Sequence, residues 1–268
     1  MRRKVVYESS KFILYDIQNN SSQTLVIIGT GNIIDWRPMH LQKPIYSNCS
    51  IYAMYFKKKH TGIEAAGRQL ADYINTCNYM TVFFVGHSKC GVMAYTSLAS
   101  NLKTRHQFFL VSAPLNGTEL ATPNVLKHRF FNSDKKLFFR CLALPIHALE
   151  YFIYRYLFYG NYPVDHDIAL DSDYIFNNFN PIVLRRHDFV NIVTSCEDIS
   201  TEKSIADLFL CWLDKRLSIN GDGVVSLSSQ MALKPSYIIN ATHSSSLFAS
   251  RDIIQSYIND ANDVQSSI

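Results

Sequence analysis

A serine, an aspartate and a histidine in this sequence could together turn a hydroxyl group into a nucleophile. Ser88 lies in the stretch Thr81–Gly91 (TVFFVGHSKCG), and Asp222 and His243 follow late in the chain, in NGDGVVSLSSQ and NATHSSS. A serine hydroxyl is a poor nucleophile near neutral pH, so it needs a base within hydrogen-bond reach and a third group that orients the base. These residues could supply that chemistry only if the fold brings them together.

The surroundings of Ser88 predict a tight turn between a strand and a helix. Thr81–Val85 is a β-branched and aromatic run typical of a buried strand, and Lys89–Leu102 has the spacing of a helix. A serine at such a turn needs small residues two positions to either side, because the strand and helix backbones nearly touch. Gly86 and Cys90 occupy these positions. The pattern G-x-S-x-G is therefore matched except that a cysteine replaces the second glycine.

Strand-like segments alternate with helical ones along the chain. Most of the strand-like segments are continuous apolar runs, which indicates strands buried on both faces of a parallel sheet. They are Phe12–Asp16, Thr24–Ile28, Ile51–Phe56, Thr81–Val85, Phe108–Ser112, Val190–Ser195 and Tyr237–Asn240. Ile63–Ile74 has the apolar spacing of a helix that covers the sheet. The alternation predicts one α/β domain over residues 1–268.

The predicted strands also explain how distant residues could meet. Asp222 lies in a glycine-flanked loop, and His243 follows the predicted strand Tyr237–Asn240. The carboxyl ends of parallel strands share one edge of the sheet, where ligands bind. Ser88, Asp222 and His243 are therefore expected to converge at that edge. Asp198, which follows the predicted strand Val190–Ser195, is the alternative acid.

Taken together, these motifs resemble an α/β-hydrolase of the lipase and esterase type. GHSKCG resembles the lipase elbow G-H-S-x-G-G, GDGVVSLSS resembles the loop that carries the acid in many lipases, and VSAPLNGT resembles a turn that follows the next strand. The order Ser, Asp, His along the chain matches as well. The resemblance runs from about Thr24 to His243 and implies a mostly parallel central sheet with helices on both faces and a helical lid or cap.

The same resemblance implies an oxyanion hole made of two backbone N–H groups. One would come from Lys89, directly after the serine, and the other from Thr30 in the GTGN loop after Thr24–Ile28. Ile28 stands where lipases often have a histidine, so the position of the second donor could shift by one residue. The alternative is that the glycines of this loop only permit a tight turn.

A long segment between two predicted strands interrupts the alternation. It corresponds to an insertion over residues 117–187, and its centre, Lys135–Gly160, is rich in Phe, Tyr and Leu. Charged residues and Pro145 interrupt this centre, which favours two short amphipathic helices over a membrane-spanning helix. We expect a lid or cap that would cover an apolar ligand or contact a membrane surface. The alternative is an ordinary helical subdomain.

Composition excludes several other classes of protein. The net charge is only +4, and no Lys/Arg cluster with interleaved aromatics predicts nucleic-acid binding. The six cysteines have no C-x-x-C spacing, so they are interpreted as reduced core residues. The acidic stretch Asp165–Asp173 (DHDIALDSD) does not match a calcium-binding loop. The N-terminal residues lack the apolar stretch of a signal peptide, which predicts a cytoplasmic protein, peripheral to membranes at most.

The resemblance implies hydrolysis of carboxylic esters, with Ser88, Asp222 and His243 as the catalytic residues and a lipid or other apolar ester as substrate. Neither a cofactor nor a metal is expected. An acyltransferase or thioesterase would use the same residues, and a non-catalytic lipid- or partner-binding module would keep only the fold. The oligomeric state is not predicted.

Overall fold

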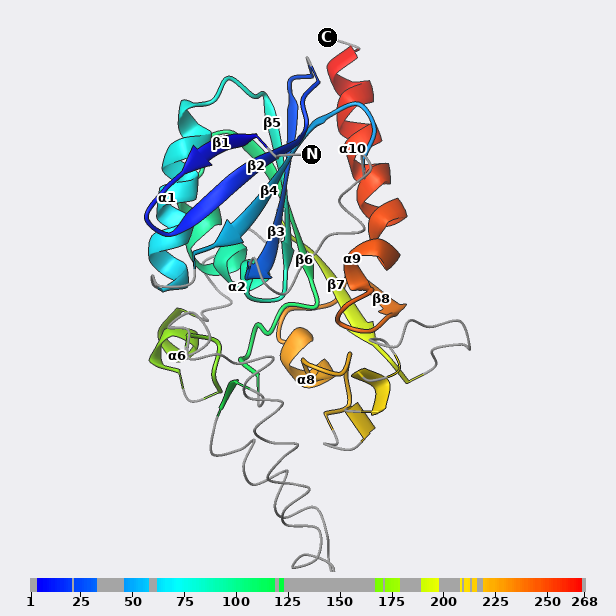
Figure 1. Cartoon of the computed structure of the whole chain (residues 1–268). Coiled ribbons are helices and arrows are strands. Elements are labelled where there is room, and N and C mark those ends of the chain that lie inside the picture. Colours follow the sequence, from blue (N-terminus) through cyan, green and yellow to red (C-terminus); the bar gives the residue numbers. More distant parts are fainter. Residues whose placement is uncertain are drawn as a thin grey trace, which may run out of the picture.

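The computed structural model describes residues 4–20, 22–32, 46–57, 62–118, 121–122, 167–170, 172–178, 189–197, 208, 210–212, 214–215 and 219–266. Its centre is an eight-stranded sheet in the order β1-β2-β4-β3-β5-β6-β7-β8 (Figure 1). The strands are β1 (Val5–Glu8), β2 (Phe12–Gln18), β3 (Thr24–Asn32), β4 (Ser50–Phe56), β5 (Thr81–His87), β6 (Arg105–Val111), β7 (Phe189–Ser195) and β8 (Tyr237–Asn240). All seven strands expected from the sequence are present, and the sheet is mostly parallel, as predicted.

The first two strands depart from the parallel pattern. β2 runs antiparallel to both β1 and β4, whereas each pairing from β4 through β8 is parallel. The sequence did not indicate β1, a strand of four residues whose two end residues are exposed. β3 is also longer than expected, because it continues through GTGN to Asn32. The segment expected to be a loop is therefore the end of a strand.

Helices cover both faces of the sheet, as expected (Figure 1). α1 (Ile63–Thr76) matches the predicted helix, and the helix expected over Lys89–Leu102 consists of α2 (Lys89–Met93), a π-helical turn (Ala94–Leu98) and a 3-10 turn (Ala99–Asn101). The remaining helices are α6 (Asp173–Asn178), α8 (Leu227–Gln230), α9 (Ser246–Ala249) and α10 (Arg251–Ser266). α1 and α2 lie on one face of the sheet, and α10 lies on the other.

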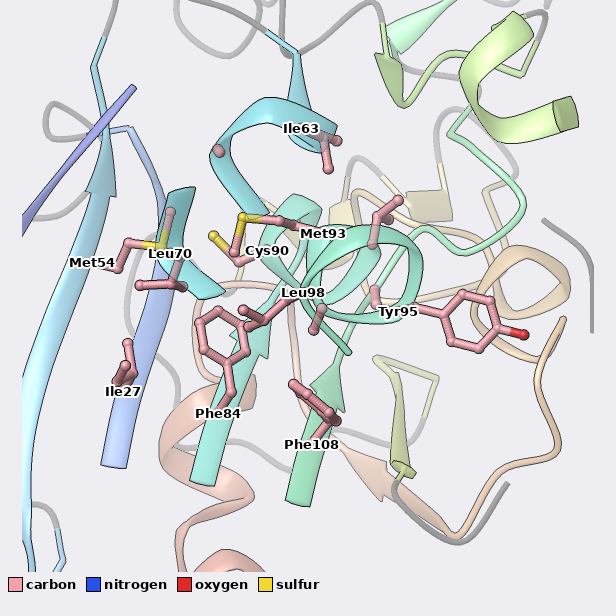
Figure 2. Packing of buried hydrophobic residues seen from close by; sticks show 14 of the residues in the cluster. Ile27, Met54, Ile63, Leu70, Phe84, Cys90, Met93, Tyr95, Leu98 and Phe108 are labelled. Carbon is pink, nitrogen blue, oxygen red and sulfur yellow. The ribbon is translucent and has the colours of Figure 1, made fainter. Parts of the chain in front are cut away.

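The core is split into two layers by the sheet. Ile27 and Phe84 belong to the layer under α1 and α2, which is drawn in Figure 2, whereas Ile28 and Val85 belong to the layer under α10. Successive residues of a strand point to opposite faces, so one continuous apolar run supplies both layers. This arrangement explains why the strands have apolar residues without alternation.

Part of the predicted insertion falls within the described residues. α6 belongs to it, and Thr118 forms a bridge with Ala169. Asp167, from the acidic stretch Asp165–Asp173, accepts a hydrogen bond from the N–H of Ile63 at 2.8 Å and so satisfies one of the N–H groups that the first turn of α1 leaves without a helical partner. The segment Lys135–Gly160 and most of the insertion lie outside the described residues.

Two further sequence expectations concern membranes and cysteines. Among the residues that the structure describes, no helix has the length and apolar character needed to cross a membrane. The cysteines within the described residues are free thiols: Cys49, Cys77, Cys90, Cys196 and Cys211. Of these, Cys49, Cys90 and Cys196 are buried. Cys141 lies outside the described residues.

Candidate active site

Ser88 occupies the turn between β5 and α2, and its backbone is strained there. Its φ of 56° and ψ of −129° lie in a region that residues other than glycine rarely adopt. The turn is held at both ends, because the Ser88 N–H donates to the carbonyl of Val111 at 3.0 Å and the Ser88 carbonyl accepts from the Gly91 N–H at 2.8 Å. This is the strand–turn–helix arrangement that the sequence predicts, and it is the geometry of a nucleophile elbow.

Two glycines allow the strand and the helix to approach this closely. A Cβ atom on Gly86 would lie 2.7 Å from the Cys90 carbonyl oxygen and 2.8 Å from the Gly91 Cα, and a Cβ atom on Gly91 would lie 2.5 Å from the Cβ of Ala113. Only glycine fits at either position without a shift of the backbone. The glycine on the helix side of the elbow is therefore Gly91, one position later than the G-x-S-x-G pattern places it.

Cys90, the departure from that pattern, fits because it faces away from the close approach. It is fully buried in the layer of Figure 2, and its thiol donates to the Thr30 carbonyl at 3.2 Å. Burial raises the pKa of this thiol to about 12, so it is neutral near pH 7. The cysteine is a packing residue between the elbow and β3.

Asp222 and His243, expected to converge, are in direct contact. The Nδ1 atom of His243 lies 2.8 Å from Oδ2 of Asp222, and the His243 N–H donates to the Asp222 carbonyl at 2.9 Å. An ionised carboxylate only accepts hydrogen bonds, so Nδ1 carries the hydrogen and Nε2 of the neutral ring is left as a base. The Asp222 side chain is fully buried, whereas the His243 side chain is 14% exposed.

The Asp222 carboxylate is stabilised in its charged form by four donors. Oδ1 accepts from the N–H groups of Val224 (3.0 Å) and Val225 (2.8 Å), while Oδ2 accepts from His243 and from the Thr194 hydroxyl (3.0 Å). Burial by itself raises the pKa of this carboxyl, but His243 and the backbone donors outweigh it, so the pKa lies below its ordinary value. Asp222 is therefore ionised near neutral pH.

Thr194 is held in place by two polar residues, Ser112 and Gln230. No motif in the sequence indicated this role for them. The Ser112 hydroxyl lies 2.6 Å from the Thr194 hydroxyl. Gln230 accepts from the Thr194 N–H at 2.8 Å and donates to the Thr194 carbonyl at 3.0 Å. All three are buried, and they come from segments that follow β6, end β7 and form α8. The one signal for Thr194 was its place near the carboxyl end of a predicted strand.

His87 joins the elbow to the His243 loop. Its Nε2 donates to the His243 carbonyl at 3.0 Å, and the two imidazole rings have centroids 4.5 Å apart. Since His87 directly precedes Ser88, this contact brings the backbone of the candidate nucleophile beside the segment that carries the candidate base.

The two residues expected to form an oxyanion hole lie on either side of the elbow. Lys89 is the first residue of α2, and Thr30 lies near the end of β3, where its carbonyl accepts from the thiol of Cys90. The pairing of β3 with β4 is irregular between Thr30 and Asn32, directly after the last residue of β3 that pairs with β5, which is Gly29.

Asp198, the alternative acid, lies outside the described residues. Within the ranges that the structure describes, no group of three or more His, Cys, Asp or Glu side chains is arranged to hold a metal ion. The candidate site is thus a Ser, His and Asp set on the loops after β5, β7 and β8.

The sequence matches no family model and no curated protein, whereas the fold resembles solved structures. The mature form of the lipase BlEst2 from Bacillus licheniformis has a TM-score of 0.55 and 13% identity, with 85% of this chain and 88% of that chain covered. A candidate lipase from Acinetobacter baumannii has a TM-score of 0.52 and 15% identity, with 100% of this chain and 93% of that chain covered. The sheet order, the antiparallel β2 and the likeness to these structures together show that the chain has the α/β-hydrolase fold.

Proposed function

We propose that this protein is a serine hydrolase that cleaves carboxylic esters through an acyl-enzyme intermediate. Ser88 is the nucleophile, His243 the general base and acid, and Asp222 the residue that orients the imidazole. The N–H groups of Thr30 and Lys89 hold the oxyanion. The observation that carries the proposal is the 2.8 Å contact between His243 Nδ1 and the buried Asp222 carboxylate, in a loop tied to a strained serine elbow.

The contact between Asp222 and His243 favours catalysis over a purely structural role. Asp222 holds the His243 imidazole in the tautomer whose Nε2 carries no hydrogen. This tautomer is able to take a proton from a serine hydroxyl. His243 is partly exposed, whereas Asp222 is completely buried, as expected if only the base must meet substrate. A non-catalytic binding module would have no need for both a strained serine turn and an imidazole oriented by a buried carboxylate.

In the first half of the reaction, Ser88 Oγ attacks the ester carbonyl carbon while His243 Nε2 takes the hydroxyl proton. Negative charge develops on the carbonyl oxygen and is stabilised by the two N–H groups, which are already oriented. The bond to the alcohol oxygen then breaks, and His243 gives its proton to the departing alcohol. The products of this half are a free alcohol and an acyl group on Ser88.

In the second half, a water molecule attacks the acyl group and loses a proton to His243. The tetrahedral intermediate again places its negative charge on the oxyanion donors. When it collapses, the carboxylic acid leaves and Ser88 regains its proton from His243. The side chains named here suffice for this chemistry, with no cofactor in the sequence of steps.

The substrate class is part of the proposal. Both solved structures reported above are described as lipases, which favours esters with an apolar acyl chain. The aromatic composition of Lys135–Gly160 favours the same class, because a cover rich in Phe and Tyr would suit an apolar chain.

A fluorophosphonate probe tests the proposed function directly. The purified protein should be labelled on Ser88, and Ser88→Ala should abolish labelling because it removes the proposed nucleophile. Ser100→Ala, an exposed serine on the same helical segment, is the matched control and should be labelled like the original protein. A series of p-nitrophenyl esters then gives the preferred acyl length. Folded protein that stays unlabelled would show the proposal to be wrong.

A further inference from the structure

A second buried carboxylate lies behind the loop that carries Asp222. Asp214 is 6% exposed, and its Oδ1 atom accepts from the N–H groups of Gly221 at 2.8 Å and of Gly223 at 3.3 Å. These two residues flank Asp222 on either side. One carboxylate oxygen therefore fastens the backbone immediately before and immediately after the candidate acid.

Other hydrogen bonds among the described residues hold carbonyl groups of this loop: the Asp222 carbonyl accepts from the His243 N–H, the Val224 carbonyl from the Thr118 hydroxyl at 3.0 Å, and the Val225 carbonyl from the Gln230 side chain at 3.1 Å. The Gly221 carbonyl accepts from the Cys196 N–H at 2.8 Å, which joins the loop to the end of β7. The Asp222 N–H donates to the Val225 carbonyl at 3.2 Å, inside the turn itself. Asp214 is thus the described side chain that holds the N–H groups on both sides of Asp222.

The charges around Asp214 indicate what its carboxylate contributes. Burial, and to a smaller extent the nearby carboxylates of Asp222 and Glu197, raise the pKa of Asp214, while its two backbone donors lower it. The buried Cys196 thiol is a further titratable group close to it. A negative charge here is opposed by its surroundings, so the useful feature of the side chain is an acceptor oxygen at a fixed point.

We propose that Asp214 is a positioning residue for catalysis, whose Oδ1 atom sets the orientation of Asp222 and, through it, the imidazole of His243. This inference rests on the proposed serine hydrolase activity. Asp214 acts only through Asp222. A displacement of the Asp222 loop would turn the imidazole away from Ser88 and slow the chemical step, while the groups that contact substrate stay in place.

Two substitutions separate the position of the acceptor from its charge. Asp214→Asn keeps an oxygen in place of Oδ1 and removes the charge, whereas Asp214→Glu keeps the charge and moves the oxygen by one methylene group. We expect Asp214→Asn to keep kcat within about five-fold, and Asp214→Glu to lower kcat by roughly 100-fold with KM unchanged. Asp214→Ala replaces the Glu variant if that variant does not fold. The same changes at exposed Asp72 on α1 are the controls.

Three results would contradict the positioning role of Asp214. If Asp214→Asn loses as much activity as Asp214→Glu, the charge matters and the positioning role is wrong. If both variants keep the original kcat, the contact to the two N–H groups has no catalytic consequence and the proposal also fails. A change in KM alone would likewise contradict it, because Asp214 is not expected to contact substrate.

A second measurement separates this inference from the proposed function. The proton on His243 Nδ1 is hydrogen-bonded to Asp222 and should give a downfield NMR signal that needs no substrate. Asp214→Asn should keep this signal, and Asp214→Glu should shift or broaden it. If the unaltered protein neither hydrolyses esters nor reacts with the probe, the proposed function fails, yet the signal still reports whether Asp214 positions the pair. An unchanged signal in every variant would overturn the positioning role.

Discussion

At the scale of single residues, His87 is buried, and its ring lies next to that of His243, with centroids 4.5 Å apart. It is 3% exposed, and burial, followed by the repulsion of His243, lowers its pKa from 6.5 to about 3. His87 is therefore neutral in the folded protein near neutral pH. In the unfolded chain it would take up a proton near pH 6.5.

This difference predicts a pH dependence of stability. The folded-state pKa is depressed, so the contribution of His87 is complete above pH 6.5 and is lost as the pH falls towards about 3. The loss is about 1.4 kcal/mol of unfolding free energy per pH unit in that window. His87→Gln keeps a donor for the His243 carbonyl but does not titrate. Urea unfolding of both proteins between pH 7 and pH 5 should show the steeper loss in the original protein, and parallel curves would contradict the assignment.

At the scale of elements, the contact between β3 and α2 allows the elbow to form with a cysteine at position 90 in place of the usual glycine. A Cβ atom on Gly29 of β3 would lie 2.9 Å from the Cβ of Cys90 and 2.8 Å from the ring of Phe84. The elbow pattern has a glycine at position 90, and the cysteine found there needs more space. Gly29 on β3 provides that space because it has no side chain. A departure at one position of the motif is thus matched by a residue far away in sequence.

The pair predicts a non-additive effect of two substitutions. Gly29→Ala should lower the unfolding free energy by about 1–3 kcal/mol, because the new methyl group overpacks a filled layer. Cys90→Gly should recover part of that loss in the double variant, since it removes one of the two clashes while the Phe84 ring remains. Chemical denaturation of the two single variants and the double variant measures the coupling. Strict additivity of the two effects would show that the residues do not share this space.

At the scale of the whole molecule, two core layers on opposite faces hold the sheet whose edge carries the candidate site. The layer under α10 includes Ile254 and Ile258, both fully buried, packed with strand residues such as Val26 and Phe109. α10 supplies this cover from the C-terminal part of the described chain, after His243. The loop of the candidate base is therefore anchored on one side by β8 and on the other by α9 and α10.

Removing a buried side chain from α10 should weaken the whole fold. Ile258→Ala should lower the unfolding free energy by about 2–5 kcal/mol, because it leaves a cavity between the helix and the sheet. Asp260→Ala, on the exposed side of the same helix, should change it by less than about 0.5 kcal/mol. Thermal and urea unfolding measure both variants. Equal effects of the two substitutions would mean that α10 is not packed on the sheet in the way described here.

The features of this protein that depend on neighbouring residues could be predicted from the local sequence. Strand runs such as Thr81–Val85, the helix from Ile63 and the turn at Ser88 each follow from residues close together in the chain, where periodicity and glycine placement act directly. The candidate residues Ser88, Asp222 and His243 could also be named in advance, because each lies in a short motif or just after a predicted strand. The short β1 was missed, since its four residues are too few for periodicity to indicate a strand.

The contacts that support these residues depend on the packing of segments that are distant in the sequence. The pairing of Asp222 with His243 was expected from their places in the sequence. The fit of Cys90 against Gly29 and the hold of Asp214 on the Asp222 loop have no signal in the local sequence. The physical reason is that an aspartate or a small residue has the same local sequence pattern whether it lies in an exposed turn or in a buried contact. Only the packing of distant strands gives it a buried partner at a fixed distance.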